Sequence, residues 1–301
     1  MGHIESLIQL EDIKRLTWQA RSYLRDMRLK KSFIAGEQVS YLEGGKGAPV
    51  ILLHGYNGNV HIWRMLMEKL MVNHRVIAVE VPGFGLNSRV NRQASIYFRS
   101  LVRFLDEFTR MLRLESFHLA GTSVGSTLAC YFALEYPEKV RTLTLMSIPP
   151  LFKERDTRPT VNFDDVDFYV PQTVEEVDRL FAFMWHVPPA VPRHLRERFA
   201  EYNARNRESK IRVLQECDRK TTMLVPRLSQ IRPRTLFIYG EHDRMVSAKT
   251  LDYLEAKIPD VQTYRIEKAG HLVYVENPGE VGAVFNSFMS YNRMAPLQVP
   301  G

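Results

Sequence analysis

The residues Gly121-Thr-Ser123-Val-Gly125 form the only Gly-x-Ser-x-Gly motif in the sequence. An apolar run that ends at Ala120 precedes the motif, and a run typical of a helix, residues 127–135, follows it. A serine at a sharp strand-to-helix turn sits in strained backbone, so the residues two positions away must lack side chains that would collide. Such a turn exposes the hydroxyl, and the helix aims free N–H groups beside it. The motif therefore predicts that Ser123 is a nucleophile.

A serine hydroxyl is a weak nucleophile until a base removes its proton, and that base needs an acid to orient it. After a turn of this kind, the acid and then the histidine come later in the chain, each directly after a strand. Asp243 follows the buried apolar run 233–240, and His271 follows the alternating run 261–267. We predict Asp243 as the acid and His271 as the base. Glu241, on the same loop, is the alternative acid.

Two backbone N–H groups are the predicted donors to an oxyanion. The first belongs to Val124, directly after the nucleophile. The second belongs to Tyr56, because the apolar run 50–53 ends in His54-Gly55, and a turn there would present the next N–H. His54 precedes that turn and is expected to point into the sheet, which favours a structural over a catalytic role.

Five motifs in this order make the chain similar to a known superfamily. They are His54-Gly-Tyr56, Val81-Pro-Gly-Phe-Gly85, Gly121-Thr-Ser-Val-Gly125, Gly240-Glu-His-Asp243 and Gly270-His-Leu-Val-Tyr-Val-Glu-Asn-Pro278. The set resembles the α/β-hydrolase superfamily, and within it the branch of monoacylglycerol lipases and bacterial esterases. The motifs lie within residues 54–278. The resemblance implies the α/β-hydrolase fold, a mostly parallel sheet flanked by helices.

The resemblance also implies roles for particular residues. They are a catalytic triad of Ser123, Asp243 and His271 and an oxyanion hole formed by Tyr56 and Val124. The implied substrates are glycerol or phospholipid esters with medium-length acyl chains. Two positions depart from the family pattern. Glu80 stands where relatives usually carry aspartate before the Pro-Gly turn, and Ser126 replaces a common glycine after the serine motif.

Alternating strands and helices predict a catalytic domain made of residues 32–150 and 233–295. Residues 32–45 are typical of a hairpin that precedes the parallel part of the sheet. After the predicted sixth strand, residues 140–146, the alternation stops for about eighty residues, which is too long for a plain loop. Residues 151–232 are therefore predicted to form an inserted helical cap.

The predicted cap has clear helix signals. Thr173 and Glu176 have the spacing of a capping box, and helical patterns continue over residues 193–206 and 210–223. An apolar, aromatic cap above a serine suggests an acyl-chain pocket. Its predicted substrate contacts are Phe181, Met184 and Trp185. The alternative is that these side chains form the core of the cap itself.

Residues 1–31 are predicted to form an amphipathic basic helix ahead of the catalytic domain. Its apolar positions are Leu10, Ile13, Leu16, Ala20, Leu24 and Met27, with lysines and arginines between them. Such a helix is suited to contact with a membrane surface or to pairing with a second copy of the chain in a homodimer. Packing on its own domain is the alternative.

Composition indicates one globular domain, because the 301 residues are 45% hydrophobic and 25% charged. The net charge of +7 suggests attraction to anionic surfaces, although a solvated basic surface is the favoured explanation, and no nucleic-acid motif is present. The two cysteines lack metal-ligand spacing, so we predict no metal and no cofactor. We recognise no signal peptide and no apolar run of about 18 residues, which favours a cytoplasmic or peripheral membrane protein.

Together these features predict a serine carboxylic ester hydrolase, an esterase or lipase that acts on a lipid or other small ester through an acyl-enzyme. An identical triad would serve a hydrolase of carbon–carbon bonds in ring-cleavage products. A hydrolase-like scaffold that binds a ligand without turnover is a second alternative. Enzymes of this fold that need an aspartate nucleophile are excluded by Ser123.

Overall fold

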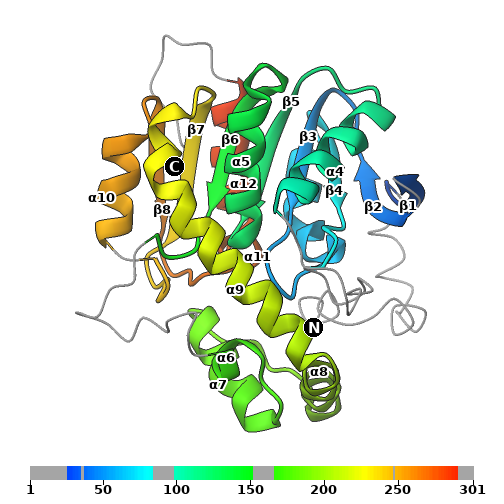
Figure 1. Cartoon of the computed structure of the whole chain (residues 1–301), viewed down its shortest axis with the longest axis vertical. Helices are drawn as coiled ribbons and strands as arrows, with labels where there is room; N and C mark the ends of the chain where they lie inside the picture. Colours follow the sequence, from blue (N-terminus) through cyan, green and yellow to red (C-terminus); the bar gives the residue numbers. More distant parts are fainter. Residues whose placement is uncertain (1–25, 35–36, 84–97, 152–165, 247, 291–301) are drawn as a thin grey trace.

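The computed structural model describes residues 26–34, 37–83, 98–151, 166–246 and 248–290 (Figure 1). An eight-stranded sheet has the order β1-β2-β4-β3-β5-β6-β7-β8. Its strands are β1 (Met27–Ile34), β2 (Glu37–Gly44), β3 (Ala48–Leu53), β4 (His74–Val79), β5 (Phe117–Thr122), β6 (Val140–Met146), β7 (Arg234–Gly240) and β8 (Val261–Ile266). β1 and β2 form an antiparallel pair, β2 is antiparallel to β4, and all other neighbours are parallel. The predicted hairpin and mostly parallel sheet are confirmed.

Helices cover both faces of the sheet, and β3 shows how the sequence directs them. Residues 50–53 are all fully buried, as expected for a parallel strand inside a three-layer fold. Ile51 and Leu53 belong to the buried cluster on the face covered by α4 (Phe98–Met111), α5 (Val124–Glu135) and α10 (Ala248–Lys257). Val50 and Leu52 pack with α3 (Arg64–Leu70) and α12 (Pro278–Ser290) on the opposite face. Shorter elements are η2 (Val60–Trp63), η3 (Pro137–Lys139), η4 (Val225–Gln230) and α11 (Val273–Glu276).

Between β6 and β7 the chain forms α6 (Val166–Tyr169), α7 (Val174–Met184), α8 (Arg193–Arg205) and α9 (Arg207–Leu224), which we call the insert. In Figure 1, α6, α7 and α8 lie beyond one end of the sheet, and α9 runs back to pack against α5. A helical insertion after the sixth strand was predicted, and it is found there. No helix in the described part of the chain is both long and apolar enough to cross a bilayer.

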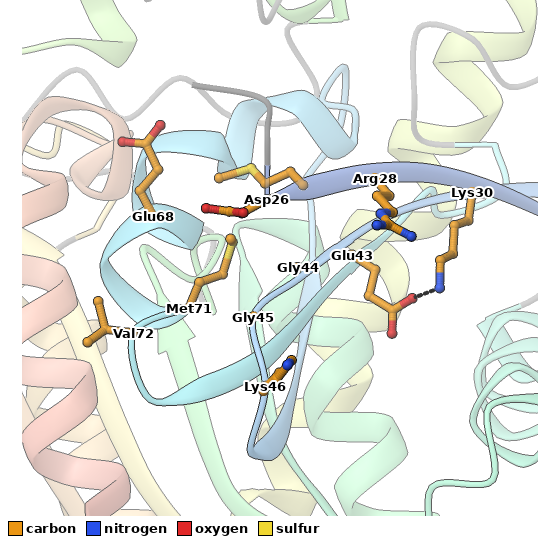
Figure 2. A pocket seen from close by; sticks show the side chains of 11 residues that line it. Asp26, Arg28, Lys30, Glu43, Gly44, Gly45, Lys46, Glu68, Met71 and Val72 are labelled. Carbon is orange, nitrogen blue, oxygen red and sulfur yellow. Dashed lines mark ion pairs between the residues drawn. The ribbon is translucent and has the colours of Figure 1, made fainter. Parts of the chain in front are cut away.

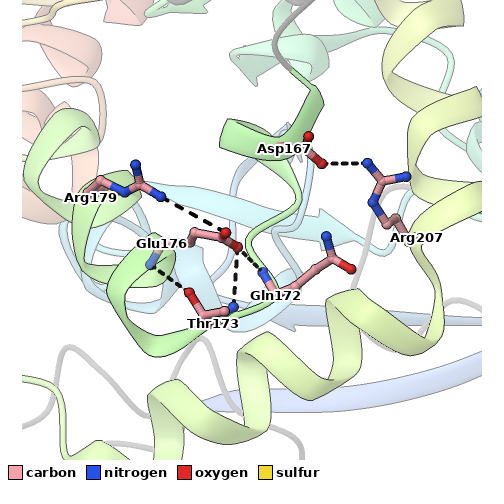
Figure 3. Close-up of polar contacts among 6 residues, drawn as sticks. All are labelled: Asp167, Gln172, Thr173, Glu176, Arg179 and Arg207. Atoms are coloured by element: carbon pink, nitrogen blue, oxygen red, sulfur yellow. Dashed lines mark hydrogen bonds and ion pairs between the residues drawn. The ribbon is translucent and has the colours of Figure 1, made fainter.

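Polar contacts define the ends of the insert helices (Figure 3). The Thr173 hydroxyl accepts the N–H of Glu176 at 3.2 Å, and the Glu176 carboxylate accepts the N–H of Thr173 at 3.2 Å. This is the predicted capping box, and it begins α7. An ion pair between Asp167 and Arg207 joins α6 to the start of α9. The insert is therefore held by its own polar contacts as well as by apolar packing.

The predicted N-terminal helix is wrong over its last residues. Residues 27–31 belong to β1, which pairs with β2 along its whole length, and Met27 is buried in this edge strand. The backbone hydrogen bonds of β2 are available at the sheet edge, and pairing with them outweighs the helical spacing of the apolar side chains. Residues 1–25 lie outside the described part of the chain.

Candidate active site

Ser123 is the single residue between the end of β5 and the start of α5. Its φ of 51° is in the left-handed region that side chains rarely adopt. A Cβ at Gly121 would lie 2.2 Å from the carbonyl oxygen of Gly125, and one at Gly125 would lie 2.3 Å from that of Leu53. Both glycines are therefore required by close backbone contacts. The serine stands on the strained turn that the motif predicts.

Ser126, one of the two departures from the family pattern, fits this turn. Its buried hydroxyl donates to the carbonyl oxygen of Gly121 at 2.7 Å, and lies 3.2 Å from that of Met146. The buried hydroxyl of Ser126 is thus hydrogen-bonded to β5 and β6. A serine here ties the start of α5 to the two strands beneath it.

Asp243 and His271 are in direct contact. Nδ1 of His271 lies 2.9 Å from Oδ2 of Asp243, and both side chains are almost completely buried. Oδ1 of Asp243 accepts the N–H of Met245 at 2.8 Å and that of Val246 at 3.2 Å. Burial alone would raise the pKa of Asp243, but His271 and the hydrogen bond from Met245 outweigh it and hold this pKa below its usual value. The acid is therefore ionised.

An ionised carboxylate only accepts hydrogen bonds, so Nδ1 of His271 carries the proton of this pair. Nε2 is then left as an acceptor, and it has no partner among the described residues. The alternative acid is placed elsewhere, because Glu241 faces Arg265 on β8 at 3.5 Å and its side chain is 37% exposed. The structure brings Asp243, and not Glu241, to the histidine.

The turn after β3 lies beside the nucleophile. It closes with the N–H of Gly58 donating to the carbonyl of Gly55 at 3.1 Å, and Asn57 has a φ of 58°. A Cβ at Gly55 would lie 3.0 Å from Cβ of Ser123 and 3.6 Å from its Oγ. We call residues 55–58 the Gly55 turn. Tyr56 is its second residue, so its N–H belongs to a segment in contact with the serine.

Val124 is the first residue of α5, and an N–H in that position has no acceptor within its own helix. His54 contributes differently. Its Nδ1 lies 2.9 Å from the carbonyl of Gly55, and its Nε2 accepts the N–H of Val81 at 3.0 Å. His54 is thus occupied with the backbone of two turns, as a structural residue would be. Glu80, the second departure, accepts the N–H of Val60 at 3.1 Å and so supports the same region.

A cavity of about 100 Å³ opens on Ser123 and His271. Phe181, Met184 and Trp185, the three predicted substrate contacts, all line it. Sequence reasoning did not find the other large side chains of its wall, which are Tyr56, Ile62, Tyr169, Leu180, Phe199, Leu272 and Tyr274. They come from several different helices and turns, so no single periodic pattern marks them.

Glu276 joins the histidine loop to the insert. Its carboxylate accepts the N–H of Gly270 at 2.8 Å and that of His186, just after α7, at 2.8 Å. The N–H of His271 in turn donates to the carbonyl of Met184 at 2.8 Å. Burial raises the pKa of Glu276, although the hydrogen bonds from Gly270 and His186 oppose the shift. Glu276 lies inside one of the quoted motifs, but only the structure shows what it holds.

Comparison with known proteins supports this arrangement of the fold. "Lipase 1" of Psychrobacter immobilis is 25% identical over 284 residues, which cover 88% of this chain and 85% of that protein. "Monoacylglycerol lipase ABHD6" of Rattus norvegicus is 22% identical over 285 residues, covering 88% and 84%. Among solved structures, a bacterial membrane phospholipase A has a TM-score of 0.80 at 23% identity and covers 90% of this chain and 89% of its own.

The family model described as alpha/beta hydrolase fold matches residues 48–278, which include Ser123, Asp243 and His271. That range is more than half of the sequence, and the order of strands and helices within it is the one described above. The chain therefore belongs to the alpha/beta hydrolase fold family.

Proposed function

We propose that this protein is a serine carboxylic ester hydrolase, with Ser123, Asp243 and His271 as its triad. The observation that carries the proposal is the free Nε2 of His271, which lines the same cavity as the strained Ser123 while Nδ1 is held by a buried, ionised Asp243. A base with this tautomer can take a proton from a serine hydroxyl. The lipases among the relatives add support for ester cleavage.

The proposed reaction proceeds through an acyl-enzyme. Nε2 of His271 removes the hydroxyl proton as Oγ of Ser123 attacks the ester carbonyl, and the negative charge forms on the carbonyl oxygen. The N–H groups of Tyr56 and Val124 stabilise this oxyanion. The intermediate then expels the alcohol, which takes the proton from His271. A water molecule repeats the attack on the acyl-enzyme, and the carboxylic acid leaves with Ser123 regenerated.

The substrates that fit are esters of aliphatic acids, including monoacylglycerol and phospholipid esters with medium-length chains. The cavity wall supports this choice, because Phe181, Met184 and Trp185 have large apolar side chains and line the same cavity as Ser123. A volume of about 100 Å³ is small beside the roughly 300–1,000 Å³ of common ligand pockets. A medium chain would therefore need the insert to shift outward. We propose that residues 151–232 act as this cap over the catalytic domain.

Contact with a lipid surface is part of the same proposal. The net charge of +7 would attract anionic lipids, and the names of two similar proteins refer to monoacylglycerol and to a membrane. The basic segment proposed to make this contact, residues 1–25, lies outside the described part of the chain. Deleting it should lower the rate on vesicle-bound esters and leave the rate on dissolved esters unchanged.

A panel of nitrophenyl esters with acyl chains of increasing length tests the proposed function. We expect hydrolysis to peak at one chain length and to fall by about 10⁵-fold or more in Ser123→Ala, because the nucleophile is lost. If both proteins were equally inactive on every ester, the proposed ester hydrolase function would be contradicted. Turnover of dienol diketo acids would then indicate a carbon–carbon hydrolase, and inertness toward those as well would indicate a binding scaffold.

A further inference from the structure

Lys210 is a buried cation at the start of α9. It is 4% exposed, and no carboxylate of the described residues forms an ion pair with it. Its Nζ instead donates to the amide oxygens of Asn57 and Asn203, the second at 2.5 Å. The rings of Tyr202 and Tyr56 surround it, with centroids 4.7 and 5.7 Å from Nζ. A lysine in such surroundings is unusual, because a buried charge is costly without a counter-charge.

The hydrogen bond to Asn57 links the insert to the Gly55 turn. Asn57 is 153 positions away from Lys210 along the chain and directly follows Tyr56. Its Nδ2 donates to the carbonyl of Tyr169 in α6 at 3.4 Å, so the insert holds both ends of this side-chain amide. The backbone of Asn57 also has a positive φ, which a fixed side chain helps to maintain.

We propose that the Lys210 ammonium is a positioning group that fixes the Gly55 turn, and with it the N–H of Tyr56, against the insert. Turnover then requires Lys210 to be charged, because one charge-assisted hydrogen bond ties the ammonium to Asn57 in the turn and a second ties it to Asn203 in the insert. The inference rests on the proposed role of Tyr56 in ester hydrolysis. Lys210 itself contacts neither the substrate nor Ser123. Its proposed effect is to position the N–H of Tyr56 as a hydrogen-bond donor to the oxyanion.

The surroundings make this charge sensitive to pH. Burial lowers the pKa of Lys210 to about 7, because its ammonium is removed from water without a counter-ion. The titratable groups that face it are Tyr56 from the Gly55 turn and Tyr202 from α8, and burial raises the pKa of both. Beyond them lie Cys217, whose pKa burial also raises, and Glu80, whose carboxyl pKa burial raises despite His54. Neither tyrosine nor Cys217 ionises near neutral pH, so we expect an alkaline loss of kcat that begins near the pKa of Lys210.

Asn203→Asp is the sharpest test. Oδ1 of Asn203 accepts from Lys210, whereas its Nδ2 has no partner among the described residues, so the substitution adds a carboxylate without removing a hydrogen bond. The new carboxylate should keep Lys210 protonated to higher pH. Relative to each protein's own plateau at pH 6, we expect the alkaline loss of kcat to move upward by about one pH unit or more. A midpoint that stays in place would overturn the proposal.

Lys210→Met removes the charge and keeps the length of the side chain. We expect kcat at pH 6 to fall about tenfold with KM changed less than twofold, and the alkaline loss to disappear. The melting temperature at pH 6 is expected to fall as well, because the amide oxygens of Asn57 and Asn203 lose their donor. A lower melting temperature with unchanged kcat would show a purely structural lysine. Lys220→Met, on the same helix, is the matched control. Glu80→Gln should leave the pH midpoint of the alkaline loss of kcat unchanged.

A readout without turnover separates this inference from the proposed function. The backbone amide signal of Asn57 in NMR should titrate with a midpoint near the pKa of Lys210, lose this titration in Lys210→Met and shift it upward in Asn203→Asp. If the Asn57 amide signal follows the titration of Lys210 but the protein cleaves no ester, the contact between Lys210 and the Gly55 turn is supported and the proposed ester hydrolase function is contradicted. Ester hydrolysis with an Asn57 amide indifferent to Lys210 would refute the inference alone.

Discussion

Asp243 shows how one buried carboxylate selects the state of its neighbour. It receives three hydrogen bonds, from His271, Met245 and Val246, and its pKa lies below the usual value. In Asp243→Asn the amide nitrogen would face Nδ1 of His271 and favour the tautomer with the proton on Nε2. We expect kcat for ester hydrolysis to fall about 10⁴-fold, because that tautomer cannot accept the serine proton.

The matched control is Glu241→Gln, because Glu241 lies two residues away but faces Arg265. Its kcat should stay within about twofold of the wild-type value. Steady-state rates on one nitrophenyl ester, with melting temperatures to confirm folding, compare the two variants. A loss confined to Glu241→Gln, or an Asp243→Asn enzyme of nearly full activity, would contradict this assignment of the acid.

The residues that could be predicted from sequence are those whose neighbours along the chain reveal their place. Ser123, Asp243 and His271 each follow a recognisable strand, and strand ends at the same edge of a parallel sheet converge. The sequence favoured Asp243 as the acid but left Glu241 as an alternative, because the two residues lie on one loop and the direction of each side chain is not visible in the sequence. That direction is decided by the N–H groups of Met245 and Val246, which bind the carboxylate of Asp243.

Three strands at the edge of the sheet meet at Glu43. Figure 2 shows Lys30 of β1 in an ion pair with Glu43 of β2, at 2.5 Å, and Arg75 of β4 lies 2.6 Å from the same carboxylate. Burial would raise the pKa of Glu43, but Lys30 and Arg75 outweigh it and hold this pKa below its usual value. Such a group stabilises the fold above the pKa of the unfolded chain, about 4.3, and this stabilisation is lost as pH falls through the folded pKa.

Glu43→Gln should therefore matter at neutral pH and not in acid. We expect its melting temperature at pH 7 to be about 2 °C below that of the wild type, which corresponds to about 1 kcal/mol for a chain of this size. The difference should shrink as the pH falls below the unfolded pKa of about 4.3 and through the lower folded pKa, where the wild-type carboxyl becomes protonated as well. Thermal unfolding followed by circular dichroism between pH 3 and pH 7 measures this difference in melting temperature. If the difference in melting temperature stayed constant with pH, the contribution of Glu43 to stability would not depend on its charge.

β1 illustrates where element prediction fails. Met27 fits the helical spacing of the preceding apolar residues, yet it is buried in a strand. Helical spacing is a local property, whereas the decision here is made by β2, whose edge offers a row of backbone partners. The capping box at Thr173 was predictable for the opposite reason, because all of its partners lie within three residues.

The molecule as a whole depends on contacts that cross between the sheet and the insert. Lys210 reaches Asn57, and Glu276 joins the loop of His271 to the backbone of His186. These pairs are far apart in sequence and follow no period, so they could not be predicted from the chain alone. The fold class, the succession of strands and helices along the chain and the insertion after β6 could be predicted, because each strand and helix carries its own apolar pattern.

Both crossing contacts end on segments proposed to act in catalysis, the Gly55 turn and the histidine loop. The insert thus lines the cavity and is hydrogen-bonded to both of these segments. A medium acyl chain that pushes it outward would strain these contacts. We therefore expect chain length to affect kcat as well as KM in the nitrophenyl ester panel.

The most direct measurement is labelling with a fluorophosphonate, which reacts with an activated serine, followed by mass spectrometry of the peptides. We expect the adduct on the peptide that contains Ser123, with ester hydrolysis lost in proportion to labelling, and no adduct at that position in Ser123→Ala. An adduct on a different residue, or a Ser123→Ala protein that hydrolyses esters as fast as the wild type, would contradict the assignment of Ser123 as the nucleophile.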